Sequence, residues 1–335
     1  MTEKLLLSDQ QIIDCLHTYY GIEIASLDIL HLGADTEAFV YQARTLDQTP
    51  YFLKVKRGHS HDIALEIIKL LEHAGVEQII SPLKTIQGQI AQRLDGFTLI
   101  VYPFVDGQDG FHQNLTDEQW ITLGKALKQI HGINVPLRVQ DQIRKETYSP
   151  KWRNIVRSIY AHLETLPITN ELALALQTFL KKNRSIIHRL VDRAELLGEK
   201  LQKQSPRCVL CHSDLHAGNV LIDQNGKIYI VDWDEPIMAP KERDLMFIGS
   251  GVGNAWNQPH EEILFYQGYG KTEIDQAVLS YYRHERIVED IAIYSQELLI
   301  KTAEEKDKAE MYRHFLNMFA PRGVVEIAFE TDEAN

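Results

Sequence analysis

Residues 211–222 read CHSDLHAGNVLI, and the sequence VDWDEP follows at 231–236. Two short apolar runs flank a polar turn at 223–227, a pattern that predicts two strands joined by a tight turn. Such a hairpin would place Asp214, Asn219 and Asp232 at one of its ends. One carboxylate can accept a hydroxyl proton, while an amide oxygen and a second carboxylate can hold magnesium against phosphates. The stretch therefore predicts a phosphoryl-transfer site.

The simpler interpretation is that these residues only form turns. H-x-D alone arises by chance, and an aspartate after an apolar strand is often a turn former. The full H-x-D-x-x-x-x-N spacing, followed by D-W-D between two apolar runs, is much more specific. We therefore interpret the stretch as catalytic.

The same segment resembles the catalytic and metal-binding loops of the aminoglycoside phosphotransferase family, whose members are relatives of the protein kinases. The resemblance also includes VDWDEPIMAPKERDLMFIG at 231–249 and YYRHERIVEDIA at 281–292, and it covers nearly all 335 residues. It implies that Asp214 is catalytic and that Asn219 and Asp232 bind Mg²⁺. It further implies ATP as the phosphate donor and a cationic aminocyclitol antibiotic as the acceptor.

The fold that this resemblance implies is an α+β, bilobal, protein-kinase-like fold. We expect an N-terminal nucleotide-binding lobe at 1–102 with an antiparallel sheet and a helix. A hinge linker is expected at 103–110, because YPFVDGQDG carries proline, glycine and aspartate. A C-terminal lobe at 111–335 would be mainly helical and would contain the catalytic β-hairpin.

Local patterns predict the individual elements. Ser8 and Gln11 have the spacing of a capping box, which predicts a helix that ends at Gly21. Strands are expected at 22–33, 37–44, 51–58, 89–93 and 98–102, with an amphipathic helix at 61–75. Further helices are expected at 116–131, 152–166, 170–202, 260–268 and 274–299, and another after 301.

Composition limits the classes of function. The chain is 44% hydrophobic and 24% charged, as in ordinary globular proteins. Its net charge of −12 argues against a nucleic-acid partner and is compatible with a cationic substrate. The apolar run at the start is too short for a signal peptide, and none approaches the roughly 18 residues of a membrane helix. We therefore expect a cytoplasmic protein without a membrane partner; its oligomeric state is left open.

The three cysteines are Cys15, Cys208 and Cys211. The run C-x-x-C-H at 208–212 matches the haem-attachment pattern. We reject this interpretation because such attachment belongs to exported proteins and because His212 begins the catalytic loop. A zinc site would need further cysteine or histidine ligands at matched spacing. Both members of the pair are therefore expected to be small buried hydrophobic residues.

Lys54 lies in the middle of a predicted strand, where a lysine is costly unless it has a charged partner. The family resemblance assigns this lysine to the ATP phosphates, and Lys56, on the same strand face, is the rival. In kinases a helix glutamate pairs with the strand lysine. Glu66 is the candidate, with Asp62 as the alternative. A solvated helix face would equally explain both acids.

Two further nucleotide contacts are expected from position in the family. The loop GADTE at 33–37 lies where a kinase covers the phosphates, but with one glycine it does not match G-x-G-x-x-G. Adenine would lie against the linker, with the carbonyl of Pro103 as acceptor and the N–H of Val105 as donor. Proline has no N–H, so only its carbonyl can serve.

The acceptor is expected to bind in the C-terminal half. Carboxylates and an aromatic wall suit a cationic aminocyclitol. The candidates are Asp234, Glu235, Trp256, Glu289 and Asp290. The alternatives are that Glu235 pairs with Lys241 or Arg243, that 283–290 forms surface pairs along a helix, and that Trp256 is core. We also expect Arg243 and Asp244 to be a buried structural pair that supports the metal loop.

Two rival functions remain at this stage. A metabolic kinase of choline, a sugar or an amino alcohol would share the same catalytic loops. A nucleotide-binding pseudokinase usually lacks the base, the metal ligands or the lysine. The sequence disfavours it because Lys54, Asp214, Asn219 and Asp232 are all present.

Overall fold

The computed structural model describes residues 7–30, 38–58, 62–168, 170–300 and 305–333. It divides into two compact units. The first contains Met1–Gln108, Pro136–Gln142 and Leu221–Asp234, and the second contains Asp109–Val135, Ile143–Val220 and Glu235–Asn335. The first unit thus includes two segments from far along the chain, which the expected lobe boundaries did not anticipate.

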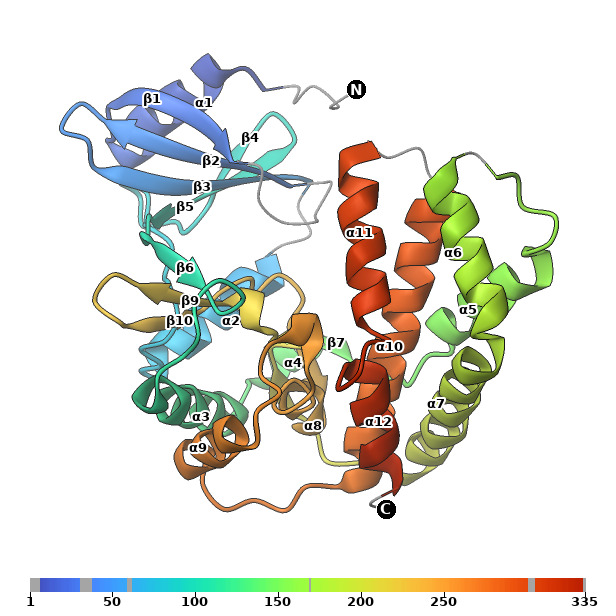
Figure 1. Cartoon of the computed structure of the whole chain (residues 1–335). Helices are drawn as coiled ribbons and strands as arrows, with labels where there is room; N and C mark the ends of the chain where they lie inside the picture. Colours follow the sequence, from blue (N-terminus) through green and yellow to red (C-terminus); the bar gives the residue numbers. More distant parts are fainter. Residues whose placement is uncertain (1–6, 31–37, 59–61, 169, 301–304, 334–335) are drawn as a thin grey trace. The chain divides into compact units, whose positions relative to one another are not determined.

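The first unit is built on a five-stranded antiparallel sheet (Figure 1). Its strands, in spatial order, are β1 (Ile24–Leu30), β2 (Ala38–Thr45), β3 (Pro50–Arg57), β5 (Phe97–Pro103) and β4 (Gln92–Leu94). The expected antiparallel N-terminal sheet is confirmed. Lys54 lies on the central strand, opposite Val40 on one side and Ile100 on the other.

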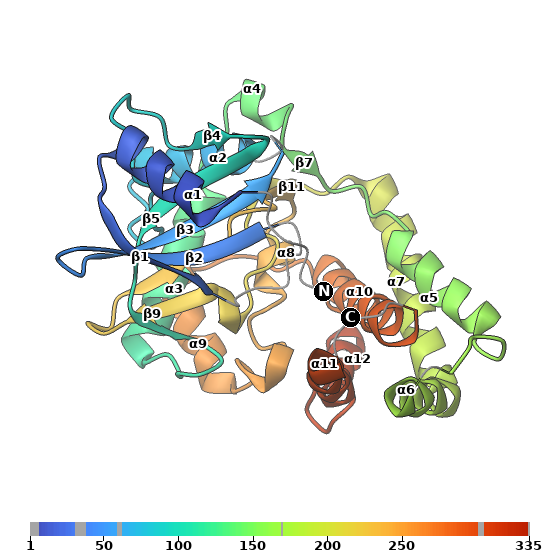
Figure 2. The ribbon, with the colours of Figure 1, turned by 90° about the horizontal axis from the view of Figure 1, so that it is seen from above.

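Helix α1 (Asp9–Cys15) covers one face of this sheet (Figure 2). Ser8 and Gln11 form the expected capping box. A π-helical turn, Leu16–Tyr20, extends the helix to Gly21, whose φ of 68° is in the left-handed region that glycine favours. The core contains Ile12, Leu16, Leu53 and Val55. Because alternate residues of a strand face opposite sides, Lys54 and Lys56 lie on the face away from α1.

The first unit also holds α2 (Asp62–His73), α4 (Leu137–Gln140) and the predicted hairpin. β9 (Val220–Asp223) and β10 (Ile228–Ile230) are neighbours in a sheet with β6 (Gly107–Asp109). The segment 103–110, expected to be a hinge linker, therefore also contains a paired strand. A Cβ on Gly107 would lie 2.1 Å from the carbonyl oxygen of Ile222, so this close approach requires glycine.

The second unit is mainly helical, as expected, and is organised around α10 (Gln276–Leu299), which Figure 1 shows among neighbouring helices. These are α5 (Lys151–His162), α6 (Glu171–Lys182), α7 (Arg184–Gln204), α11 (Glu305–Asn317) and α12 (Val324–Glu333). The expectation of one helical stretch over 170–202 was wrong in one respect. The chain breaks at Asn183, which caps the end of α6 and adopts φ −101° and ψ 17°.

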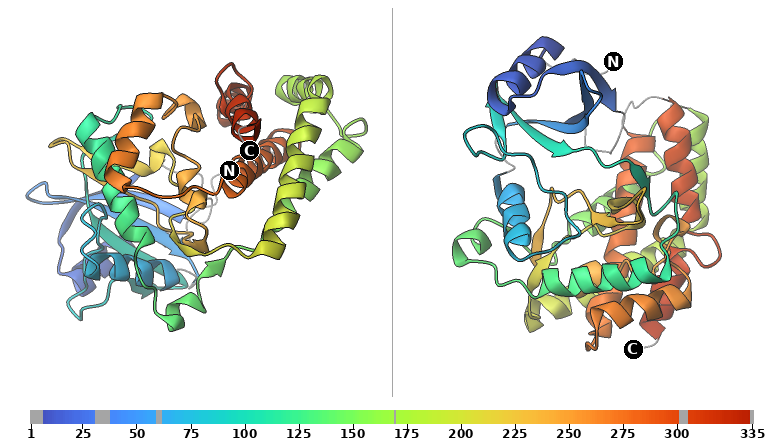
Figure 3. Two further views of the ribbon diagram at one scale, coloured as in Figure 1. Left: turned by 90° about the horizontal axis from the view of Figure 1, so that it is seen from below. Right: turned by 90° about the vertical axis from the view of Figure 1, so that its left-hand side faces the viewer.

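Two other helices of this unit, α3 (Asp117–His131) and α9 (Pro259–Tyr269), pack side by side (Figure 3). A Cβ on Gly124 would lie 2.1 Å from the carbonyl of Phe265, so glycine permits the close packing. Thr116 and Gln119 form the expected capping box of α3. Across the ranges that the structure describes, no helix is both long and apolar enough to cross a membrane.

The remaining elements of the second unit are short. A three-stranded sheet has the order β7 (Arg144–Lys145), β11 (Ile237–Ala239) and β8 (Val209–Cys211). The unit also contains two 3₁₀ turns and a short helix, which are η2 (Ala217–Asn219), η3 (Val252–Asn254) and α8 (Glu242–Leu245). Cys211 is buried, as expected, and its thiol donates to the carbonyls of Ala239 and Pro240. Cys208 is exposed, so its expected burial was wrong.

Candidate active site

Strand β8 leads directly into the predicted catalytic loop, and Asp244 fixes the backbone at this junction. Its carboxylate accepts the N–H of His212 at 2.9 Å and that of Ser213 at 2.7 Å. His131 lies 3.0 Å from the same carboxylate. Burial alone would raise the pKa of Asp244, but its hydrogen bond to His131 and nearby positive charge keep that pKa below its usual range. The loop therefore starts from a fixed anchor.

The expected buried pair of Arg243 and Asp244 was half right. Asp244 is fully buried and supports the loop, but its side-chain partner is His131. The guanidinium of Arg243 instead lies 5.6 Å from the ring centre of Tyr282. The side chains of Asp244 and His131 are 113 residues apart in sequence, which is why local patterns did not pair them.

Ser213 occupies a backbone conformation that few side chains adopt. Its φ is 79°, in the left-handed region where a non-glycine residue costs roughly 1–2 kcal/mol. Its hydroxyl donates to the carbonyl of Glu235 at 2.8 Å, which offsets part of that cost. The turn at Ser213 directs the chain from the anchored strand into Asp214.

The carboxylate of Asp214 has a different neighbour at each oxygen. Arg286 Nη1 lies 2.5 Å from Oδ1, and His216 Nε2 lies 3.4 Å from Oδ2. Burial by itself would raise the pKa of Asp214. The charge of Arg286, with the hydrogen bond of His216, outweighs burial and holds that pKa well below its usual range. The carboxylate is therefore anionic at neutral pH.

Asn219 is oriented by the same loop. Its side-chain nitrogen donates to the backbone carbonyl of Asp214 at 2.7 Å. The amide oxygen is then the atom of this side chain that has the chemistry of a magnesium ligand. Asp232, the other predicted ligand, lies in the first unit, two residues after β10, with φ 62°. The pairing of the two ligands on one ion stays a prediction.

In the first unit, two lysines converge on two aspartates. Lys54 Nζ lies 3.1 Å from Asp232 Oδ1 and also forms an ion pair with Asp234 Oδ2. Lys56 Nζ lies 2.5 Å from the same Asp234 oxygen. Burial would lower the pKa of Lys54, but Asp234 and Asp232 raise it, so the ammonium stays charged. The same two lysines outweigh burial at Asp234 and lower its pKa.

The expected partner of Lys54 was wrong. Glu66 forms an ion pair with Lys69, one turn away on α2, at 2.7 Å, and the partners of Lys54 are the two aspartates. Residues three apart on a helix lie next to each other, so an acid and a lysine at this spacing readily form an ion pair. The side chain of Asp62, the alternative, lies outside the described residues, and so does the loop 33–37.

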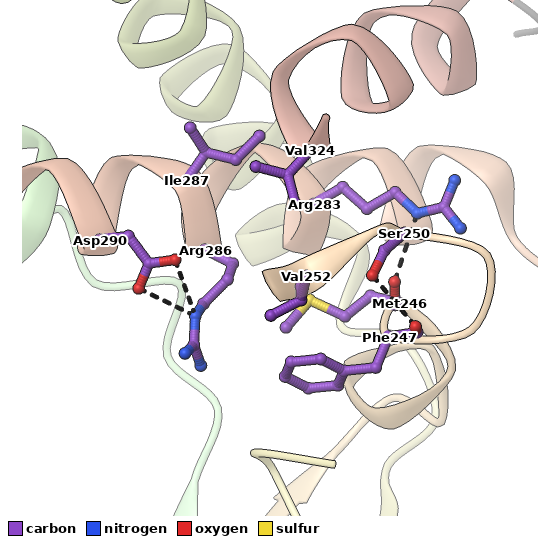
Figure 4. Close-up of a pocket in the computed structure, with 9 residues that line it drawn as sticks. All are labelled: Met246, Phe247, Ser250, Val252, Arg283, Arg286, Ile287, Asp290 and Val324. Carbon is purple, nitrogen blue, oxygen red and sulfur yellow. Dashed lines mark hydrogen bonds and ion pairs between the residues drawn. The ribbon is translucent and has the colours of Figure 1, made fainter. Parts of the chain in front are cut away.

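Among the predicted acceptor residues, Asp290 is linked to the predicted catalytic residue Asp214 through one side chain. Arg286 connects the two acids, at 3.1 Å from Asp290 Oδ1 (Figure 4). Burial and the charge of Glu289 raise the pKa of Asp290 to about 6, against the opposing effect of Arg286. The interpretation of 283–290 as surface pairs was therefore incomplete, because Arg286 reaches Asp214.

Figure 4 shows a small recess beside Arg286 and Asp290, and Phe247 and Val252 are among its other lining residues. Its volume is about 20 Å³, which is space for about one water molecule. The Arg286 guanidinium lies 5.7 Å from the ring centre of Phe247. The recess by itself is too small to enclose an aminocyclitol.

Other predicted acceptor residues have structural partners. Trp256 is buried and packs edge-on against Trp120, with ring centres 5.1 Å apart, so it is a core residue and not an open aromatic wall. Glu235 is exposed and pairs with Arg144 at 3.1 Å, not with Lys241 or Arg243. Asp234 is held by lysines in the first unit. Glu289 lies half-buried on α10.

The predicted adenine contacts lie in the first unit. Pro103 is the last residue of β5, opposite Tyr51, and is exposed. Val105 is half-buried, two residues before β6. Their backbone roles toward adenine stay predictions.

Sequence reasoning missed His216, His131 and the reach of Arg286. His216 stands inside the H-x-D-x-x-x-x-N motif, two residues after Asp214, and this position was the available signal. The partners of Arg286 and His131 lie 72 and 113 residues away, and one sequence carries no signal for such pairs.

With this geometry in place, comparison with known proteins decides the family. The sequence model of the phosphotransferase enzyme family matches residues 28–277. The chain belongs to this family. The expected membership is thereby confirmed, and with it an enzyme of the phosphotransferase type.

Solved structures of family members are similar over the whole chain. Spectinomycin phosphotransferase APH(9)-Ia, in complex with ADP and spectinomycin, is 50% identical to this chain, with a TM-score of 0.92. The match covers 98% of this chain and 100% of the other. Its AMP-bound complex is 49% identical, with 97% and 99% covered and a TM-score of 0.88. The kinase-like fold is thus confirmed.

Two more distant similarities were found, and the solved structure among them supports the fold alone. An amicoumacin kinase structure is 18% identical, with 95% of each chain covered and a TM-score of 0.63. Protein StrN of Streptomyces griseus is 23% identical over 268 residues, which are 73% of this chain and 76% of that protein.

Proposed function

We propose that this chain is an antibiotic kinase that transfers the γ-phosphate of ATP to a hydroxyl of spectinomycin and so gives resistance. The observation that carries the proposal is the 50% identity to spectinomycin phosphotransferase over nearly the full length of both chains. That relative binds ADP and spectinomycin. The donors, acids and amide that such a transfer needs are all present in this chain.

Asp214 would be the residue that meets the acceptor hydroxyl. Because its pKa is held low, it is a weak base and a permanent anion. Its main contribution would be to accept the hydrogen bond of the hydroxyl and to orient the oxygen toward the phosphate. The proton would pass to Asp214 late, since phosphoryl transfer depends mostly on positioning and charge neutralisation.

The nucleotide phosphates would be met by Lys54. An ammonium is a compact charge without fixed direction, so Lys54 can exchange its aspartate partners for phosphate oxygens. Pro103 and Val105 are proposed to contact adenine through backbone atoms. The lobe boundaries at 1–102, 103–110 and 111–335 are kept as a functional description of nucleotide side, hinge and acceptor side.

The predicted magnesium ligands fit a hard cation. Asn219 offers its amide oxygen, because its nitrogen is used by the Asp214 carbonyl. Asp232 offers a carboxylate that is half exposed. Oxygen ligands of this kind are what Mg²⁺ prefers, and when bound it would neutralise charge on the phosphates.

On the acceptor side, Asp290 and Glu289 are proposed to attract a protonated amine of the aminocyclitol. Both lie on α10 within one turn of Arg286, which contacts Asp214. A cytoplasmic location, where ATP is available, is part of the same proposal.

The test is ADP release by the purified protein with ATP and Mg²⁺. Spectinomycin, kanamycin and choline are supplied one at a time, beside a reaction without acceptor. Turnover with spectinomycin alone is expected, and product mass should increase by one phosphoryl group. Asp214→Ala, run in parallel, excludes a contaminating kinase.

The outcomes separate the rival functions. Phosphorylation of choline and not of spectinomycin would overturn the proposed substrate and identify a metabolic kinase. Nucleotide binding without turnover of any acceptor, equal for wild type and Asp214→Ala, would favour the pseudokinase.

A further inference from the structure

The two oxygens of the Asp214 carboxylate are bracketed by side chains from different parts of the second unit. Arg286 comes from α10, 72 residues away, and contacts Oδ1. His216 comes from the same loop and faces Oδ2 with Nε2 at 3.4 Å. Arg286 supplies charge, which leaves open what His216 supplies.

The hydrogen bonds of His216 fix which ring nitrogen carries the proton. The backbone N–H of Gly218 donates to Nδ1 at 3.1 Å. A nitrogen that accepts cannot also carry a proton, so the neutral ring is protonated on Nε2. The Nε2–H group is therefore the one that faces Asp214. The nitrogen of Asn219 lies 3.5 Å from Nε2, but an amide nitrogen is itself a donor and cannot accept the Nε2 proton; one of its two hydrogens is given to the Asp214 carbonyl.

The ring of His216 is also fixed in orientation by two phenylalanines. Phe111 stacks on it, with ring centres 5.5 Å apart and planes at 22°, and Phe247 packs edge-on at 6.3 Å. Phe111 itself fits against two glycines. A Cβ on Gly253 would lie 2.4 Å from the Phe111 ring, and one on Gly218 would lie 2.7 Å from it. Any larger residue there would displace the stacked ring.

We propose that His216 is a positioning residue for the phosphoryl transfer. Its Nε2–H directs the second oxygen of Asp214, so that the carboxylate meets the acceptor hydroxyl in one orientation. Rotation about the last bond of an aspartate is soft, and Arg286 alone contacts only one oxygen. The inference rests on the proposed function, because it takes Asp214 as the residue that orients the acceptor.

The competing explanation is that His216 only caps the 3₁₀ turn Ala217–Asn219, through Nδ1 and Gly218. Two conservative variants separate the roles. In His216→Asn the side-chain oxygen can take the place of Nδ1 and keep the cap, but the shorter side chain leaves no donor at Oδ2 of Asp214. In His216→Gln the amide nitrogen can take the place of Nε2 and keep the donor to Asp214, while the cap is lost.

The experiment measures kcat and KM for both substrates with wild type, His216→Asn and His216→Gln. We expect His216→Asn to lose about 10- to 100-fold in kcat, the scale of a misplaced catalytic group, with KM for ATP within about twofold. His216→Gln should keep most of kcat. The reverse order, or equal loss in both variants, would show a structural role and overturn the proposal. Wild-type rates in both would also overturn it.

Crystal structures of the two variants provide a readout that does not depend on turnover. The Asp214 carboxylate should keep its orientation in His216→Gln and turn in His216→Asn, with the loop backbone unchanged in both. An unchanged carboxylate in His216→Asn would overturn the positioning role. If the wild type fails to phosphorylate spectinomycin, the proposed function is wrong, and these structures still decide whether His216 orients Asp214.

Discussion

The acidic groups of the two units are held in contrasting ways. In the first unit, Lys54 and Lys56 both contact the same oxygen of Asp234. In the second, each oxygen of Asp214 has its own neighbour, Arg286 at one and His216 at the other. Lysine is a point charge without fixed direction, whereas the arginine fork and the histidine ring have defined geometry.

This difference matches two tasks. A carboxylate shared by lysines can release them to a stronger anion, such as a triphosphate, without breaking a directional arrangement. A carboxylate held by arginine and histidine keeps its orientation while a hydroxyl approaches. The first arrangement suits binding and the second suits positioning. Four sets of substitutions test this assignment, in decreasing order of expected effect.

The strongest test compares the two units directly through Asp214→Ala and Asp232→Ala. Asp214→Ala should lower kcat by about 10²–10⁴-fold, as for loss of a general base, with nucleotide affinity close to wild type. Asp232→Ala should also lose magnesium-dependent nucleotide binding. Turnover and equilibrium binding of nucleotide, with and without Mg²⁺, measure both effects. Equal loss of binding in the two variants would mean that base and metal ligand have been confused.

The lysine cluster gives the next largest effect. Lys54→Met should lower kcat/KM for ATP by about 100-fold, because the transferred phosphoryl group loses the contact with one positively charged side chain. Lys56→Met should have a smaller effect on kcat/KM, because its side chain is 3% exposed, against 16% for Lys54. Steady-state kinetics with varied ATP distinguish them. A larger loss in Lys56→Met would assign the phosphates to Lys56.

Asp244→Asn tests how far orientation in the second unit depends on the buried anchor. The variant should lose about 3 kcal/mol of unfolding free energy, as when one partner of a buried pair is removed. Urea unfolding measures this loss.

The pH dependence of the same variant follows from the lowered pKa of Asp244. Stability from a lowered carboxyl pKa is present above the unfolded value of about 4 and is lost as the pH falls through the folded value. Wild type should therefore lose stability on acidification more steeply than Asp244→Asn. If the unfolding free energies of the two proteins fell equally with pH, Asp244 would be excluded as the source of the acid sensitivity.

The smallest effect is expected at Asp290, the second partner of Arg286. Its pKa is raised to about 6, so the folded protein binds this proton more tightly than the unfolded chain. Stability should consequently increase as the pH falls from about 6 toward about 4. Asp290→Asn removes that contribution. Unfolding free energies of both proteins at several pH values test it, and an identical slope in the two would contradict the raised pKa.

Patterns of nearby residues predicted most elements of the fold. The capping boxes at Ser8 and Thr116 form as expected, and the turn after Asp223 joins two strands. Glu66 was mispredicted because Lys69, a helix neighbour, takes its charge. Trp256 was mispredicted because the polar sequence around it carries no sign that Trp120, from a distant part of the chain, packs against it.

The sequence by itself pointed to the family through the resemblance of its motifs, and it predicted the hairpin. It also singled out Asp214, Asn219, Asp232 and Lys54 as the proposed site residues, because motif spacing and strand alternation are local features. Only the tertiary structure decided which charges meet. Asp214 with Arg286 and Asp244 with His131 join residues far apart in the chain. Such contacts follow from how helices and strands pack in three dimensions, and side-chain geometry then sets the pKa and orientation of each acid.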